Sequence, residues 1–93
     1  MRIRRRFKLL QMEWVDAASY TEEWHYDKEL DDDIAATMVQ STGFLVREND
    51  LFYVLAGTIT YSVDKDDYMY CCIIEIPKTC VKTLKELDGS VEV

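Results

Sequence analysis

The sequence predicts a single all-β domain. A chain of 93 residues has the length of one domain, and three of its features indicate strands. The stretch "FKLLQMEWV" alternates apolar and polar side chains with a period of two, as a strand with one buried face does. The runs "LFYVLAG" and "YMYCCIIEI" are rich in β-branched and aromatic residues and are bounded by Asn and Asp. The only proline separates the second run from a short final one, in "IEIPKTCVKTL".

The first strand is expected over residues 7–15, and it ends at a turn-prone run of small and polar residues. Residues 17–33 then form a long acidic loop that is rich in aromatic side chains. The alternative is a helix over residues 22–30, since Glu, Lys and Leu favour helices. The triple aspartate after it would lie at the negative end of the helix dipole, which favours the loop with at most a turn or two of helix.

The second half of the chain predicts two hairpins. Asn49 and Asp50 tolerate left-handed backbone conformations, so a turn is expected there between two strands. Gly43 and Gly57 indicate bends or bulges within those strands. The strands expected after residue 43 cover 44–46, 51–56 continuing through 58–63, 68–76 and 81–87, with a turn at 64–67.

Pro77 indicates how the last two strands are connected. Proline has no N–H for strand pairing, and its fixed φ suits the first position of a tight helical turn. "PKTC" has room for one 3₁₀ turn before the last strand. This order of elements predicts a five-stranded SH3-like barrel. An Sm-like barrel, also small and five-stranded, is the close competitor, and an α+β domain is third if residues 22–30 are helical.

Charge is distributed unevenly along the chain. The net charge is −7, but the first eight residues form a basic arm with Arg2, Arg4, Arg5, Arg6 and Lys8. From Leu9 onward the chain contains six basic and eighteen acidic residues, so this part of it repels nucleic-acid phosphates. The arm is interpreted as a solvated segment that keeps an edge strand soluble. The alternative is a contact with nucleic acid or with an acidic protein surface.

The densest group of candidate binding residues lies where the first strand meets the long loop. Aromatic side chains in such a loop can form a groove for a peptide, a base or a nucleotide. The residues predicted to bind a ligand or partner are Trp14, Asp16, Ser19, Tyr20, Trp24, His25 and Tyr26. The competing interpretation is that Trp14 belongs to the core and that Trp24 anchors the loop.

The acidic runs have two interpretations. Asp31, Asp32 and Asp33 form an acidic patch that could imitate DNA phosphates together with the turn at residues 64–67. An ordinary solvated loop is the simpler interpretation. His25 with Asp27 and its acidic neighbours matches no metal-ligand spacing, so no metal and no cofactor are expected.

The three cysteines, Cys71, Cys72 and Cys80, are expected to be free buried thiols. Adjacent residues of a strand point to opposite faces, so Cys71 and Cys72 are not expected to bind one metal together. No apolar run reaches the ~18 residues of a membrane span, and the start does not continue as a signal peptide, so a cytoplasmic protein is expected. The sequence has no glycine-rich phosphate loop and no nucleophile motif, so catalysis is not expected.

Three short motifs carry a resemblance. Trp14-Val-Asp16, Gly43-Phe-Leu-Val46 and Ile76-Pro-Lys78 occur in an order that resembles small, poorly characterised proteins encoded by bacteriophages and prophages. The resemblance spans residues 13–87 and excludes the arginine-rich start and the triple aspartate. It implies an accessory protein that is made in the host cytoplasm and acts by binding.

The leading prediction is therefore a non-catalytic, homo-oligomeric binding module that acts on a host protein or small ligand and counters host regulation or defence. The alternatives are an Sm-like nucleic-acid-binding protein that uses its basic arm, and an acidic DNA mimic.

Overall fold

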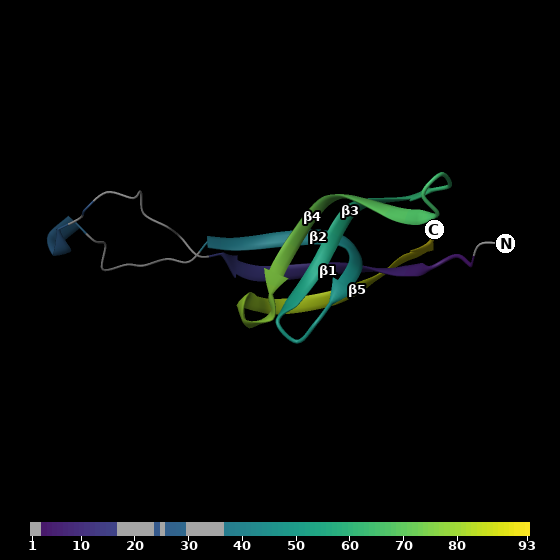
Figure 1. The fold of residues 1–93 in the computed structure, drawn as a ribbon. Helices are drawn as coiled ribbons and strands as arrows, with labels where there is room; N and C mark the ends of the chain where they lie inside the picture. The colour runs from purple at the N-terminus through teal and green to yellow at the C-terminus, as the bar shows by residue number, and fades with distance from the viewer. Residues whose placement is uncertain (1–2, 17–23, 25, 30–36) are drawn as a thin grey trace.

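The computed structural model describes residues 3–16, 24, 26–29 and 37–93. It has five antiparallel strands in one sheet with the order β4-β3-β2-β1-β5 (Figure 1). The strands are β1 (Arg6–Asp16), β2 (Thr37–Glu48), β3 (Phe52–Ser62), β4 (Asp67–Pro77) and β5 (Val81–Glu92), with 3₁₀ helices η1 (Asp27–Glu29) and η2 (Lys78–Cys80). The predicted all-β class is confirmed. A helix over 22–30 is wrong for the part that is described, where only the single 3₁₀ turn occurs.

β1 provides the central part of the core. Its alternation places Leu10, Met12 and Trp14 in one buried cluster, which Leu55 and Ile76 complete. A register shift against β5 between Phe7 and Leu9 resets the alternation. Phe7 consequently faces a second buried cluster with Val46 and Ala56.

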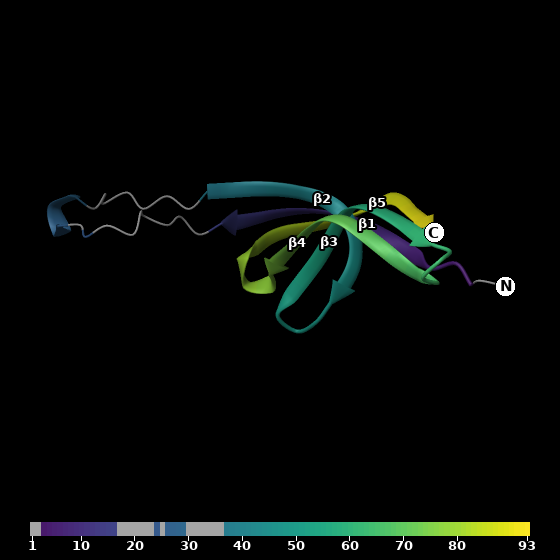
Figure 2. The ribbon, with the colours of Figure 1, turned by 45° about the horizontal axis from the view of Figure 1, so that its top comes forward.

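β2 changes its pairing partner along its length and bends as it does so (Figures 1 and 2). Residues 37–44 pair with β1, and residues 44–48 pair with β3. Gly43 lies at this transition, where an added Cβ would lie 3.0 Å from the carbonyl oxygen of Ala56. The predicted bend at Gly43 therefore coincides with a close approach of two strands, while the bulge itself falls between Leu45 and Arg47.

The end of the chain follows the prediction from Pro77. Pro77 precedes η2, and the 3₁₀ turn before the last strand is confirmed. β5 continues to Glu92, beyond the predicted end at residue 87. The extra residues pair with the start of β1, where Arg6 lies opposite Glu92. This long-range ladder outweighs the weak strand preference of Asp88 and Gly89.

The hydrogen-bonded ladder is open in the described part of the chain, because β4 and β5 are its two outer strands. The two edges nevertheless approach each other at one end. The Tyr68 hydroxyl of β4 donates a hydrogen bond of 2.8 Å to the carbonyl oxygen of Val93, directly after β5. The sheet is therefore curled, with side chains rather than strand pairing across its two edges.

Candidate functional site

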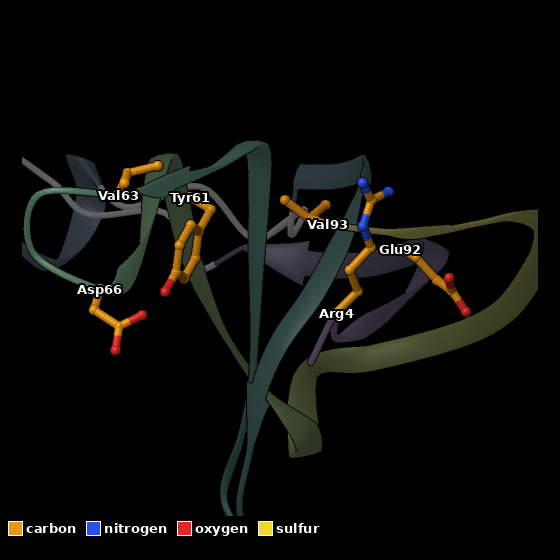
Figure 3. A pocket seen from close by; sticks show the side chains of 6 residues that line it. All are labelled: Arg4, Tyr61, Val63, Asp66, Glu92 and Val93. Atoms are coloured by element: carbon orange, nitrogen blue, oxygen red, sulfur yellow. The ribbon is translucent and has the colours of Figure 1, made fainter. Parts of the chain in front are cut away.

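A groove lies at the end of the sheet where residues 4 and 93 meet the β3–β4 turn. It has a volume of about 670 Å³. Figure 3 shows Tyr61, Val63 and Asp66 on one side of it, and Arg4, Glu92 and Val93 on the other. One side of the groove therefore carries the Arg4 cation and the Glu92 carboxylate, and the other carries the Asp66 carboxylate and the Tyr61 ring.

The β3–β4 turn that forms one wall is fixed by local hydrogen bonds. The Asp66 N–H donates to the Val63 carbonyl oxygen at 3.3 Å, and Asp66 has a positive φ of 50°. The Lys65 N–H donates to the Ser62 hydroxyl at 3.3 Å. Aspartate tolerates the left-handed conformation better than most residues, which is why "DKDD" turns here.

The opposite wall is held by Arg5. Its N–H donates to the Tyr68 hydroxyl at 3.0 Å, and its guanidinium donates to the Val46 carbonyl oxygen at 3.3 Å. The same guanidinium lies 4.8 Å from the centroid of the Phe7 ring. The guanidinium thus contacts β1 and β2, and the backbone N–H of the same residue contacts β4.

Arg6 is also engaged within the sheet. Its guanidinium donates to the Glu92 carboxylate at 2.9 Å and to the Ser90 hydroxyl at 3.2 Å. The backbone of Arg5 therefore pairs with Val93 and that of Arg6 with Glu92, while both side chains remain exposed. Arg4 lines the groove, and Arg2 lies outside the described residues.

The residues of the predicted aromatic site lie in different environments. Trp14 is only 8% exposed and its indole N–H donates to the Ser41 hydroxyl at 3.0 Å, so its side chain belongs to the core. Asp16 is exposed at the end of β1. Ser19, Tyr20 and His25 lie outside the described residues, as do Asp31, Asp32 and Asp33.

Trp24 and Tyr26 are the aromatic side chains that the fold presents to solvent. Trp24 is 101% exposed and Tyr26 is 73% exposed. The Lys28 ammonium lies 6.0 Å from the centroid of the Tyr26 ring. Both residues precede η1, which lies away from the sheet in both views (Figures 1 and 2). We call Trp24, Tyr26 and η1 the aromatic tip.

The cysteines differ from their prediction. Cys71 and Cys72 are exposed rather than buried, and Cys80 is half-buried. The sulfur atoms of Cys71 and Cys72 lie 3.6 Å apart, so they do not point to opposite faces. The reason is that Cys72 has a φ of 59°, which breaks the alternation of the strand opposite Gly57. The hydrogen bond and the charge of Cys71 raise the pKa of the Cys72 thiol above its ordinary value.

Sequence reasoning did not find the groove. Its lining residues come from the start of the chain, from the end of β3 with the β3–β4 turn, and from the end of the chain. They meet through the pairing of residues 5 and 6 with residues 92 and 93 and through the contacts of Tyr68 with Arg5 and Val93. The run "DKDD" predicted the turn, but nothing in the sequence indicated which residues lie opposite it.

Comparison with known proteins gives no match to a family model, to a curated protein or to a solved structure. Among the described residues, no helix has the length and apolar character that crossing a membrane requires.

Proposed function

We propose that this chain is a non-catalytic binding module, in which an SH3-like or Sm-like barrel carries the aromatic tip to a partner protein. The barrel assignment is supported by the strand order β4-β3-β2-β1-β5 and by the single 3₁₀ turn before β5. The contact between Tyr68 and Val93 further supports it, since it links the two outer strands.

The observation that carries the proposal is the exposure of Trp24 and Tyr26. Every other aromatic residue in the described part of the chain is buried or half-buried. Tryptophan and tyrosine dominate the binding energy of many interfaces because they bury a large rigid area for few rotatable bonds. An exposed pair of them on one segment therefore fits a contact with another protein.

The negative charge of residues 22–33, which include the aromatic tip, indicates the kind of partner surface that would bind it. Residues 22–33 contain seven carboxylates and one basic residue, Lys28. A partner surface with an apolar pocket for Trp24 and a basic rim would match both features. In keeping with the resemblance of its motifs to bacteriophage proteins, the proposed partner is a host protein of the cytoplasm, and its capture counters host regulation or defence.

The proposal is tested with Trp24→Ala and a matched control, Leu51→Ala, which removes another exposed apolar side chain far from residue 24 in sequence. Host proteins retained by the immobilised wild type are identified, and the affinity of each purified candidate is then measured by calorimetry. We expect Trp24→Ala to weaken binding by about thirtyfold or more, equivalent to about 2 kcal/mol, and Leu51→Ala to leave it unchanged.

Fluorescence provides an independent readout, because the chain has only two tryptophans. The exposed Trp24 should be quenched by iodide, whereas the buried Trp14 should be protected. Adding the partner should protect Trp24 as well. Equal affinity of the wild type and Trp24→Ala for every retained protein, with no change in quenching, would refute the proposal.

A further inference from the structure

Cys71 and Cys72 form an exposed pair of thiols in the middle of β4. Their sulfur atoms are 3.6 Å apart, and both residues are exposed. The pair exists because Cys72 adopts a left-handed φ of 59°, a conformation that residues other than glycine rarely adopt and that often marks functional positions.

The spacing of the two sulfur atoms fits a shared metal ion. Two thiolates at the Zn–S distance of about 2.3 Å in tetrahedral geometry are about 3.8 Å apart. The spacing fits a disulfide less well, because adjacent trans residues have Cα atoms about 3.8 Å apart, shorter than the usual range for a disulfide. Thiolate ligands select soft cations such as Zn²⁺ over Mg²⁺ or Ca²⁺.

A tetrahedral metal site has four ligands, and the two thiolates supply two of them. In the part of the chain that the structure describes, no third histidine, cysteine or carboxylate joins the pair. β4 is an outer strand of the sheet and both cysteines are exposed, so a second molecule can approach the pair. We propose that Cys71 and Cys72 bind a thiophilic divalent cation of the zinc class, and that a second copy of the chain completes the site with the same two residues.

The neighbours of the pair suit a second copy. Met69 is 57% exposed and Ile73 is 54% exposed, so apolar side chains flank the thiols on both sides. A two-fold axis near Cys71 would place Met69 opposite Ile73 of the second copy and bring the four thiols together. The same axis would place Asp67 opposite Glu75 of the second copy. This like-charge pair opposes association, so the dimer should depend on the cation.

The test uses Co²⁺, which replaces Zn²⁺ in tetrahedral thiolate sites and absorbs visible light there. The reduced, metal-free protein is titrated with Co²⁺ while the molecular mass is followed by light scattering. We expect tetrahedral absorption that saturates at one Co²⁺ per two chains, together with a doubling of the mass. Binding should release thiol protons to solvent, and Zn²⁺ should remove the colour.

Three variants define the ligands. Cys71→Ser and Cys72→Ser should abolish both the absorption and the dimer, whereas Cys80→Ser should retain both. Because all these measurements follow the metal and the mass, they are independent of the aromatic tip. Absence of tetrahedral absorption in the wild type would overturn the proposal. Saturation at one Co²⁺ per chain with an unchanged mass would overturn it too, as would unaltered binding by Cys71→Ser.

Discussion

At the scale of single residues, the buried indole of Trp14 depends on one partner. Its N–H donates to the Ser41 hydroxyl on the adjacent strand, at 3.0 Å. Ser41→Ala would leave a buried donor unsatisfied, which costs about 1–3 kcal/mol of unfolding free energy. Urea denaturation measures this difference.

The control for this prediction is Ser62→Ala, which removes a hydroxyl that accepts a hydrogen bond in an exposed turn. It should change stability by less than about 0.5 kcal/mol. The interpretation also requires that Ser41→Ala has little further effect once Trp14→Phe has removed the donor. Equal losses in the two backgrounds would show that Ser41 acts in another way.

Residue-scale reasoning succeeded where a side chain follows the regular alternation of its strand, and failed where the backbone departs from it. Leu10, Met12 and Trp14 are buried in the order that period two requires. Cys71 and Cys72 were expected on opposite faces, but one positive φ at Cys72 places their sulfur atoms side by side. A single left-handed cysteine has no sequence signal, since the residue type does not favour it.

At the scale of elements, the position of Gly43 sets how closely β2 approaches β3. An added Cβ would lie 3.0 Å from the Ala56 carbonyl oxygen and 3.1 Å from the Leu55 Cβ. Neither atom is the end of a flexible side chain, so Gly43→Ala must displace one strand from the other. We expect it to destabilise the fold by about 1–3 kcal/mol, measured by thermal or urea denaturation.

Gly89→Ala is the matched comparison. There the added Cβ would meet the Leu9 Cδ2 atom at 2.8 Å, which is the end of a side chain that can rotate away. The loss should therefore be smaller than for Gly43→Ala, despite the shorter distance. The reverse order of stabilities would contradict this explanation of the glycine at residue 43.

The elements themselves were predictable to different degrees. The five strands and the turn after Pro77 follow from local patterns, because alternation and turn chemistry act over a few residues. The extent of β5 does not, since Asp88 and Gly89 lie at a register shift, and the strand continues past them only because Val91 and Glu92 pair with β1. The groove was not predictable for the same reason, as it joins residue 4 to residues 92 and 93. The position of Trp24 in the long loop predicted that its side chain is exposed. The sequence grouped it with Trp14 in one site, and only the structure shows that Trp14 is buried while Trp24 is exposed.

At the scale of the whole molecule, the curl of the sheet depends on how its outer strands are joined. Tyr68 is central to this joint, because its hydroxyl donates to the Val93 carbonyl oxygen and accepts from the Arg5 N–H. Its ring also packs edge-on against Phe7, with centroids 5.4 Å apart. One side chain of β4 thus contacts both β1 and the end of β5, and it adjoins the groove wall formed by Val93.

Tyr68→Phe separates these two contributions. The ring remains and keeps its contact with Phe7, while both hydrogen bonds of the hydroxyl are lost. We expect a loss of about 1–2 kcal/mol in unfolding free energy, in line with one partly buried and one exposed hydrogen bond. The amide protons of Arg5 and Val93 should also exchange faster, by a larger factor than amides in the middle of β1, because the sheet opens first at its joined edges.

Tyr70→Phe is the control, since its hydroxyl accepts only a longer contact of 3.4 Å from the Arg5 guanidinium, and its effect should be smaller. If Tyr68→Phe instead changed exchange equally at all amides, the hydroxyl would contribute to stability without holding the two edges together.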